Sequence, residues 1–334
     1  MTIGIAVCTY NGQKYIKKQL DSIFNQTLKP DLVKIFDDCS KDSTSSIVSE
    51  YCRGKENWHF IQRTVNVGYR QNFNDAALQF STDILFFSDQ DDIWYPNKIE
   101  VIVKHFKDTN ASLVFSSADI IDENDTKLNK TSIDLFQIRR TEIRNLKEKF
   151  NSFIDISRRN IITGATMAIK LKDYSNAYPF PKHIIHDHWI TLFSILNGYN
   201  IVYIRKSLMQ YRIHPDQQLG AGSGTSLRNV DLDLQRKYFE DELLERLDTL
   251  EINHIDKDEY KKRLNNQKLQ EKKYLHLVEV RKKIRRQPFF IRIIMSVRLL
   301  KSGKLKDLSV YLRQISSTKI VSQYLLFIRD IFFR

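Results

Sequence analysis

Apolar and polar positions alternate along the first part of the chain in a pattern that predicts strands and helices in turn. Short apolar runs begin at Ile3, Leu32, Trp58 and Ile84, and each has the length of a buried strand. The segments between them carry apolar residues at helical spacing, most clearly over residues 11–27. Alternating strands and helices predict an α/β fold, with a mostly parallel sheet flanked by helices on both faces.

The second part of the chain has a mixed pattern. Strands are predicted at 112–121 and 199–204, with a helix between them at 185–198. Three glycines in the segment 218–226 mark a linker, and the chain beyond it has a helical pattern. We therefore predict a domain over residues 1–220, divided into halves at 1–100 and 101–220, followed by a helical region over 227–334.

The net charge of +13 is concentrated at the C-terminal end. Residues 261–334 contain 20 lysines and arginines against four aspartates and glutamates, whereas residues 1–260 contain 33 against 36. Basic residues interleaved with large apolar ones favour an amphipathic helix at an anionic membrane surface. The alternative is a helical appendage that packs on the domain or on a second copy of the chain, in a homo-oligomer. Nucleic acid is the weakest candidate partner, because it leaves the aspartates described below without a role.

The chain carries no sign of a membrane span or an export signal. It has no apolar run of about 18 residues, and its first residues begin a strand without a basic leader. We therefore expect a cytoplasmic protein, peripheral to the inner face of the cell membrane. Cys8, Cys39 and Cys52 have no metal-type spacing and are expected to be reduced thiols.

The apolar run that begins at Ile84 ends in three acidic residues, Asp89, Asp91 and Asp92. Asp89 and Asp91 are two residues apart, so in an extended segment their side chains share a face, and their repulsion raises a pKa unless a cation compensates. Mg²⁺ or Mn²⁺ takes oxygen ligands and keeps positions open for phosphate oxygens, which favours metal–diphosphate binding here. The alternative is capping of the next helix, with Asp92 as the candidate cap and Pro96 near the first turn.

The glycine-rich loops that bind diphosphates in dehydrogenases and P-loop enzymes are missing from the sequence. Neither G-x-G-x-x-G nor G-x-x-x-x-G-K-[ST] follows a predicted strand. A diphosphate would therefore have to be neutralised by a metal and by basic side chains, which the aspartate cluster and Arg70 can supply.

Four segments near successive predicted strands resemble a known family: "AVCTYNGQKYIKKQLDSIFNQT", "FDDCSKDST", "NVGYRQNFNDA" and "SDQDDIW". In this order they are similar to family 2 glycosyltransferases of the GT-A fold, a Rossmann-like architecture. The resemblance covers about Thr2 to Gly220. Further on, "NIITGATMAI", "HDHWITL" and "YRIH" resemble the acceptor half of bacterial polysaccharide transferases, and "SDQDDIW" is most similar to rhamnosyltransferases of cell-wall and O-antigen assembly.

The resemblance implies a role for each matching residue. The nucleotide-sugar site would be built by Thr9, Tyr10, Asn11, Asp38, Asn66, Gly68, Arg70, Asp89 and Gln90. The Tyr10 ring would lie against the base, and Asp38 would accept hydrogen bonds from the base or ribose. Asp91, Asp89 and His214 would bind the Mg²⁺ or Mn²⁺ ion. His186, Trp189 and Arg212 would contact the acceptor or a phosphate.

Asp187 lies between His186 and His188 at the start of a predicted helix. Inverting sugar transfer needs one carboxylate to take the proton of the acceptor hydroxyl as its oxygen attacks the anomeric carbon. The resemblance gives this general-base role to Asp187. Two alternatives stay open: Asp187 caps the helix, or the two histidines bind zinc, although histidines two apart on a helix face different ways.

These observations predict an inverting, metal-dependent glycosyltransferase. The donor would be a nucleotide-diphospho-sugar, with dTDP-rhamnose as the leading choice and a UDP-hexose or UDP-N-acetylhexosamine as its competitor. The acceptor would be a growing cell-surface polysaccharide or a lipid-linked glycan. A catalytically silent scaffold protein that binds a nucleotide sugar is the alternative from another class, and the intact Asp91 and Asp187 argue against it.

Overall fold

The computed structural model describes residues 1–146, 156, 159–215, 217, 232–249, 258–259, 261–262 and 265–266. The chain divides into two compact units, Met1–Ile255 and Asp256–Arg334, and nearly all described residues belong to the first. The predicted linker at 218–226 and most of the basic region at 261–334 lie outside the described residues.

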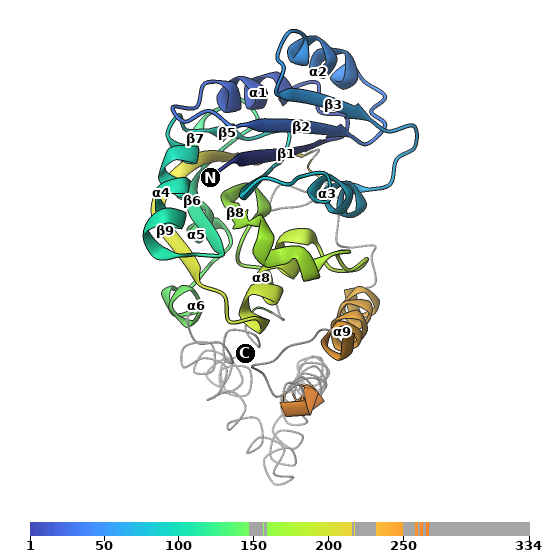
Figure 1. The fold of residues 1–334 in the computed structure, drawn as a ribbon, viewed down its shortest axis with the longest axis vertical. Helices are drawn as coiled ribbons and strands as arrows, with labels where there is room; N and C mark the ends of the chain where they lie inside the picture. Colours follow the sequence, from blue (N-terminus) through green and yellow to red (C-terminus); the bar gives the residue numbers. More distant parts are fainter. Residues whose placement is uncertain are drawn as a thin grey trace, which may run out of the picture. The chain divides into compact units, whose positions relative to one another are not determined.

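The N-terminal half forms the parallel part of the sheet. Its strands are β1 (Ile3–Thr9), β2 (Leu32–Asp37), β3 (Trp58–Gln62) and β4 (Ile84–Ser88), in the order β3-β2-β1-β4, with every neighbouring pair parallel. The connecting helices are α1 (Ile16–Phe24), α2 (Thr44–Cys52) and α3 (Tyr69–Ala77). α1 and α2 contact each other on one face of the sheet, while α3 contacts α8 (His186–Leu196) on the other (Figure 1). The α/β fold predicted from the apolar runs is confirmed.

The sheet continues through strands of the second half. β8 (Met167–Lys170) lies antiparallel between β4 and β6 (Leu113–Ile121), and β9 (Ile201–Arg212) follows parallel to β6. β5 (Ile93–Trp94) pairs with β9, and β7 (Lys127–Thr131) pairs with β6. The remaining elements of this half are α4 (Lys98–Thr109), α5 (Ser132–Leu135), α6 (Arg140–Asn145) and the 3₁₀ segments η1 (Gly164–Thr166) and η2 (Leu171–Ala177).

β9 is longer than the sequence pattern predicts. The predicted strand ended at Ile204, because the exposed Arg205 and Lys206 interrupt the apolar run. The strand instead continues to Arg212, through a shift in its register against β6. This extension brings the end of β9 to the segment Asp89–Asp92 that follows β4, called the acidic segment below. The Arg212 side chain donates a hydrogen bond there to the carbonyl of Asp91.

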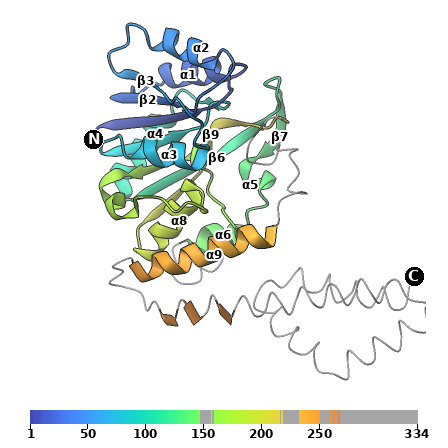
Figure 2. The ribbon, with the colours of Figure 1, turned by 90° about the vertical axis from the view of Figure 1, so that its right-hand side faces the viewer.

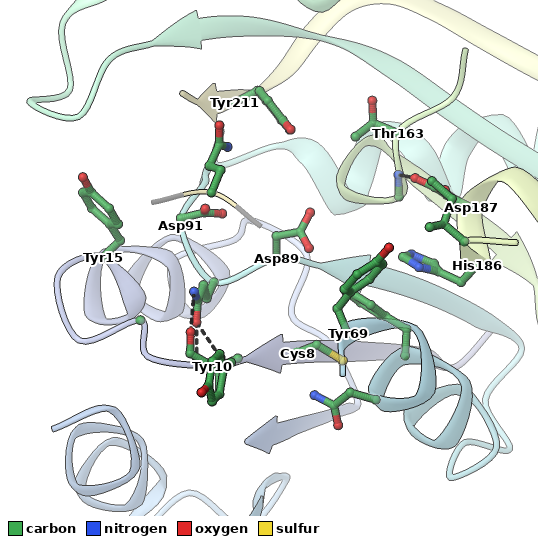
Figure 3. A pocket seen from close by; sticks show the side chains of 18 of the residues that line it. Cys8, Tyr10, Tyr15, Tyr69, Asp89, Asp91, Thr163, His186, Asp187 and Tyr211 are labelled. Atoms are coloured by element: carbon green, nitrogen blue, oxygen red, sulfur yellow. Dashed lines mark hydrogen bonds between the residues drawn. The ribbon is translucent and has the colours of Figure 1, made fainter. Parts of the chain in front are cut away.

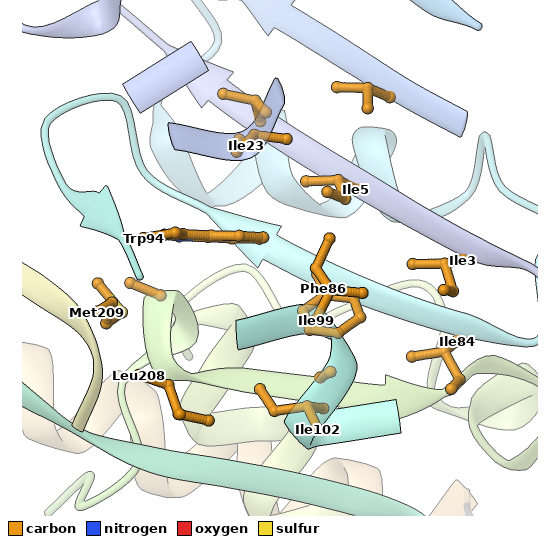
Figure 4. Packing of buried hydrophobic residues seen from close by; sticks show 14 of the residues in the cluster. Ile3, Ile5, Ile23, Ile84, Phe86, Trp94, Ile99, Ile102, Leu208 and Met209 are labelled. Atoms are coloured by element: carbon orange, nitrogen blue, oxygen red, sulfur yellow. The ribbon is translucent and has the colours of Figure 1, made fainter. Parts of the chain in front are cut away.

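Side-chain alternation along β1 and β4 separates the core from the candidate site. The odd-numbered residues of β1 pack with α1, α4 and the even-numbered residues of β4 in the main hydrophobic cluster, which includes Ile5, Phe86, Trp94 and Ile99 (Figure 4). On the other face, Cys8 lines a cavity, and the ring of Phe87 packs on the ring of Phe73 with their centroids 6.2 Å apart. Both faces of the strands are covered, which explains their continuous apolar runs. All three cysteines are free.

α9 (Leu232–Thr249) belongs to the first unit and binds the segment that precedes α8 (Figure 2). The Glu242 carboxylate accepts hydrogen bonds from the main-chain N–H groups of Lys182 (2.6 Å) and His183 (2.7 Å). Arg246 donates to the carbonyl of Pro179 at 2.8 Å. α9 therefore helps to fix the segment that leads into α8. None of the helices in the described residues is long and apolar enough to span a membrane.

Candidate active site

A cavity of about 600 Å³ opens at the carboxyl ends of β1 and β4 (Figure 3). Its wall combines the N-terminal half of the chain with segment 160–164, the start of α8 and the end of β9. Ligands of open α/β sheets bind at the carboxyl ends of strands, so the cavity lies where a substrate is expected. Ten of the residues predicted for the site line it: Thr9, Tyr10, Asn11, Asp38, Asp89, Gln90, Asp91, His186, Asp187 and His214.

Gln90 joins the end of β1 to the acidic segment. Its side-chain carbonyl accepts hydrogen bonds from the Thr9 hydroxyl (2.6 Å) and the Tyr10 N–H (2.8 Å), and its amide donates to the Tyr10 carbonyl at 3.0 Å. The first loop of the predicted nucleotide site is thus held against the segment that carries Asp89 and Asp91.

The loop between β3 and α3 is held by Asp38. The Asp38 carboxylate accepts hydrogen bonds from the N–H groups of Val67 and Gly68, both at 2.8 Å, and its carbonyl accepts one from Asn66. Gly68 has a φ of 84°, which only glycine adopts without strain. Asn66, Gly68 and Arg70, which were predicted to bind the nucleotide, do not line the cavity, whereas Asp38 lines it and orders this loop.

The acidic segment brings two carboxylates and a histidine together. The Asp91 carboxylate oxygen lies 2.9 Å from Nε2 of His214, which follows the end of β9. Burial, together with the negative charges of Asp91 and Asp187, raises the pKa of Asp89 to about 7. Carboxylates held close together in a buried place repel one another, and a nearby positive charge would lower this repulsion.

Asp92, Trp189 and Arg212, for which the sequence analysis predicted a role at the site or a helix cap, lie behind the cavity wall. Asp92 does not cap α4, because that helix begins at Lys98; its carboxylate instead accepts a hydrogen bond from the N–H of Arg212 at 3.1 Å. Trp189 is fully buried, and its indole N–H donates to the carbonyl of Ala177 at 2.9 Å. Neither Trp189 nor Arg212, which were predicted to contact acceptor or phosphate, lines the cavity.

Arg212 holds the acidic segment from behind. Its fully buried guanidinium donates to the carbonyls of Asp91 (2.7 Å) and Asp122 (2.9 Å) and forms an ion pair with Asp125 at 2.6 Å. Its carbon Cζ lies 4.5 Å from the ring centroid of Tyr15, which lines the cavity. Arg212 therefore fixes the main chain at Asp91 instead of contacting a ligand.

We expect Arg212→Met to lower the free energy of unfolding by at least about 2 kcal/mol, because it leaves two buried carbonyls without their charged donor. Thermal unfolding followed by circular dichroism measures the change. Arg205→Met is the matched control, since Arg205 is an exposed residue of the same strand, and it should change stability by no more than about 0.5 kcal/mol. Equal stability of the two variants would contradict the bracing role of Arg212.

Asp187 lies in the first turn of α8 with its carboxylate at the cavity. One oxygen accepts a hydrogen bond from the Gly164 N–H at 2.8 Å, and the other accepts one from the His188 N–H at 2.7 Å. Burial raises the pKa of Asp187 to about 6, although these hydrogen bonds oppose the rise. A carboxylate with a pKa near neutrality and a fixed orientation is suited to proton transfer.

The two histidines beside Asp187 do not form a metal pair. The His186 ring stacks on Phe73 with centroids 4.0 Å apart, and burial lowers its pKa to about 3, so it is neutral. The side chain of His188 does not line the cavity, and its ring is hydrogen-bonded to the carbonyl of Ile156. A Cβ on Gly164 would lie 2.5 Å from Nε2 of His186, so a larger residue at this position would displace the His186 ring. The zinc alternative is therefore wrong for these histidines.

Several cavity residues were missed from the sequence. The ring of Tyr69 lies between Asp89 and His186 in Figure 3, and Lys14, Thr163 and Tyr211 also line the wall. Side chains alternate along a strand, so Tyr211 points to the opposite face from Arg212, which lies behind the cavity wall. Had the full length of β9 been known, this alternation would have placed Tyr211 on the cavity face. Tyr69 and Thr163 lie in segments quoted for the family resemblance, but the sequence does not show which residues of those segments face the cavity.

The cavity wall is acidic. Among the described residues that line it, four are aspartates, Asp38, Asp89, Asp91 and Asp187, whereas Lys14 is the single lysine or arginine. A strongly negative wall repels an anionic ligand unless a cation accompanies it.

Comparison with known proteins agrees with this geometry. The sequence profile described as "Glycosyl transferase family 2" matches residues 4–163, which include all of β1 but its first residue, β2 to β4 and the acidic segment. Residues 4–163 of the chain belong to glycosyltransferase family 2. This glycosyltransferase therefore takes the sugar that it transfers from a nucleotide sugar, and the family predicted from the four sequence segments is confirmed.

Relatives and solved structures agree with this assignment. The glycosyltransferase is 29% identical to the dTDP-rhamnosyl transferase RfbG of Shigella flexneri over 251 residues, which are 69% of this chain and 79% of that one. It is 25% identical to the putative teichuronic acid biosynthesis glycosyltransferase TuaG of Bacillus subtilis over 128 residues, 38% of this chain and 51% of that one. The crystal structure of S. aureus TarS 1–349 in complex with UDP-GlcNAc has the same fold, with a TM-score of 0.54 and 21% identity over 73% of this chain and 67% of that one.

Proposed function

We propose that this glycosyltransferase is an inverting enzyme that binds its donor through a divalent cation and uses Asp187 as the general base. The charge of the cavity is the observation that carries the proposal. A diphosphate would bring its negative charge to a wall with four aspartates and one lysine, so binding without a cation is unfavourable. A divalent cation removes this repulsion by binding carboxylate and phosphate oxygens together.

The residues at the acidic segment fit Mg²⁺ or Mn²⁺. Asp91 and His214 lie side by side, and burial together with the charges of Asp91 and Asp187 raises the pKa of Asp89, an effect that a cation would oppose. Across the described residues, no three His, Cys, Asp or Glu side chains are grouped so that they could hold a metal ion. Asp91, Asp89 and His214 would therefore share the ion with oxygens of the diphosphate. When bound, the ion would stabilise the charge of the departing nucleoside diphosphate.

The protein's own residues supply the remaining chemistry. The Asp187 carboxylate takes the proton of the acceptor hydroxyl, and the N–H groups of Gly164 and His188 keep it oriented. The acceptor oxygen then forms a bond to the anomeric carbon from the face opposite the nucleoside diphosphate, whose bond to that carbon breaks. Attack from the opposite face inverts the configuration, and the proton remains on Asp187 until solvent removes it.

For the donor we propose dTDP-rhamnose and for the acceptor a carbohydrate chain of the cell surface. The name of the relative from Shigella flexneri, a dTDP-rhamnosyl transferase, supports this donor at 29% identity. The test is a thermal-shift and donor-hydrolysis screen of dTDP-rhamnose, UDP-glucose and UDP-GlcNAc, each with Mn²⁺ and with EDTA. We expect stabilisation and release of nucleotide with dTDP-rhamnose and Mn²⁺. A response to a UDP-sugar alone would exclude the rhamnose proposal, and no response to any of the three would contradict the proposed function.

The rate of sugar transfer should rise with increasing pH and then level off. Asp187 must be ionised to accept a proton, and burial raises its pKa to about 6. The value of kcat/KM at saturating Mn²⁺ should therefore rise with pH up to about 6, by about tenfold per pH unit, and level off above it. Initial rates from about pH 5 to 8 measure the profile, with Mn²⁺ saturation checked at each pH. A rate that is flat or falls as the pH rises through 6 would contradict this role.

A further inference from the structure

Lys98 is a fully buried lysine to which the proposed mechanism gives no role. It is the first residue of α4 and has 0% of its surface exposed. A positive charge at the N-terminus of a helix opposes the helix dipole, so this position does not favour the helix itself. Burial of an ammonium group is also costly, and it is tolerated only where specific partners compensate.

The partners of Lys98 come from both halves of the site. Its Nζ donates a hydrogen bond to the carbonyl of Ala165 at 2.6 Å and lies 3.8 Å from the ring centroid of Trp94. The sulfur of Met209 is a weaker acceptor at 3.4 Å. Burial lowers the pKa of Lys98 to about 7, and the negative charges of Asp92 and Asp89, in the acidic segment, oppose this fall.

The hydrogen bond to Ala165 ends next to the candidate base. Ala165 is the middle residue of the η1 turn (Gly164–Thr166), and the N–H of Gly164 donates to the Asp187 carboxylate at 2.8 Å. The turn is packed tightly there, because a Cβ on Gly164 would meet His186 at 2.5 Å. A displacement of Ala165 would therefore displace the donor that orients Asp187.

We propose that Lys98 is a positioning residue that holds the η1 turn, and through Gly164 the Asp187 carboxylate, in place for proton transfer. The acidic segment that would bind the metal favours the charged form of Lys98, so a single buried side chain links the donor half of the cavity to the base. The inference rests on the proposed function, because it assigns Lys98 to the geometry of the proposed base.

Lys98→Met tests the proposal, since methionine has a similar length and no charge, and apolar replacements of buried charges are often tolerated. We expect kcat for sugar transfer to fall between about tenfold and a hundredfold, because small displacements of a catalytic group have effects of this size. The affinity for dTDP with Mn²⁺ should change little, since Asp89 and Asp91 remain. Met209→Leu is the matched control, because it alters packing beside the same Nζ and keeps the bond to Ala165; its kcat should equal that of the wild type.

Chemical rescue separates the ammonium from packing. In Lys98→Ala, added propylammonium should restore part of kcat, whereas 1-propanol of the same size should not. An unchanged kcat in Lys98→Met, or equal rescue by both additives, would overturn the proposal. Should neither variant fold, ¹⁵N-lysine NMR of the wild type is the measurement: dTDP or UDP with Mg²⁺ should shift the Nζ resonance of Lys98, and an unchanged resonance would overturn the link.

These outcomes are distinct from failure of the proposed function. If the wild type shows no metal-dependent turnover of a nucleotide sugar, the proposed function fails. If the wild type is active and Lys98→Met is equally active, the assignment of Lys98 alone fails.

Discussion

Asp187→Asn is expected to slow sugar transfer by between about a hundredfold and ten-thousandfold, the range that general-base catalysis supplies. The amide cannot take a proton, but it has nearly the same shape and can still accept the hydrogen bond from Gly164, so the loss should fall on kcat. The binding of dTDP or UDP with Mn²⁺ should be nearly unchanged, because Asp187 lies at the far side of the cavity from Asp91 in Figure 3. Transfer rates and calorimetric affinities measure the two effects separately.

Asp173→Asn is the control for this experiment. It is the same chemical change in η2, at a residue that does not line the cavity, and it should leave both kcat and nucleotide affinity at the wild-type values. Transfer by Asp187→Asn at the wild-type rate would remove the general base from the mechanism. A loss confined to nucleotide affinity would assign Asp187 to the donor instead.

The second large effect is expected at the acidic segment. Asp91→Ala should lower the affinity for Mn²⁺ in the presence of nucleotide by at least about a hundredfold, because loss of a metal ligand costs more than loss of the groups that orient one. Transfer at low Mn²⁺ should then be lost, and high Mn²⁺ should restore part of it. The Mn²⁺ dependence of the initial rate measures this change, with Asp173→Asn again as the control. Identical Mn²⁺ dependence in the wild type and Asp91→Ala would contradict the assignment of the metal to this residue.

The parallel half of the fold could be predicted from sequence because its strands are buried on both faces. Runs such as Ile84–Ser88 are apolar throughout and stand between clear helical segments, so their existence and order are visible in the sequence. The sequence pattern predicts β9 too short because the centre of this strand is exposed instead of buried. Its exposed centre at Arg205 and Lys206 looks like a loop, and only pairing with β6 and β5 keeps it extended.

The sequence placed at one edge of the sheet those residues that directly follow strands, and they line one cavity. Asp38, Asp89 and Asp91 come after β2 and β4, and the carboxyl ends of neighbouring parallel strands meet at one edge of a sheet. The family resemblance implied that Arg212 and Trp189 contact a ligand, yet the face on which each side chain lies is set by tertiary packing. A buried arginine that binds carbonyls and one that binds phosphate have the same sequence signature.

The contact that Lys98 makes with the η1 turn could not be predicted from the sequence. It lies near the acidic segment in the chain, but its hydrogen-bond partner, Ala165, is 67 residues away. Only the arrangement of β8 between β4 and β6 brings the η1 turn to the start of α4. The connection between the acidic segment and Asp187 therefore becomes visible only in the folded chain.

The central claim is that a divalent cation joins a nucleoside diphosphate to Asp89 and Asp91. Calorimetric titration of dTDP and of UDP into the wild-type protein, first with Mn²⁺ and then with EDTA in its place, tests it most directly. At least one of the two nucleotides should bind with Mn²⁺, and its affinity should fall by at least about a hundredfold in EDTA. Equal affinity in Mn²⁺ and EDTA, or no binding of either nucleotide with Mn²⁺, would contradict the account.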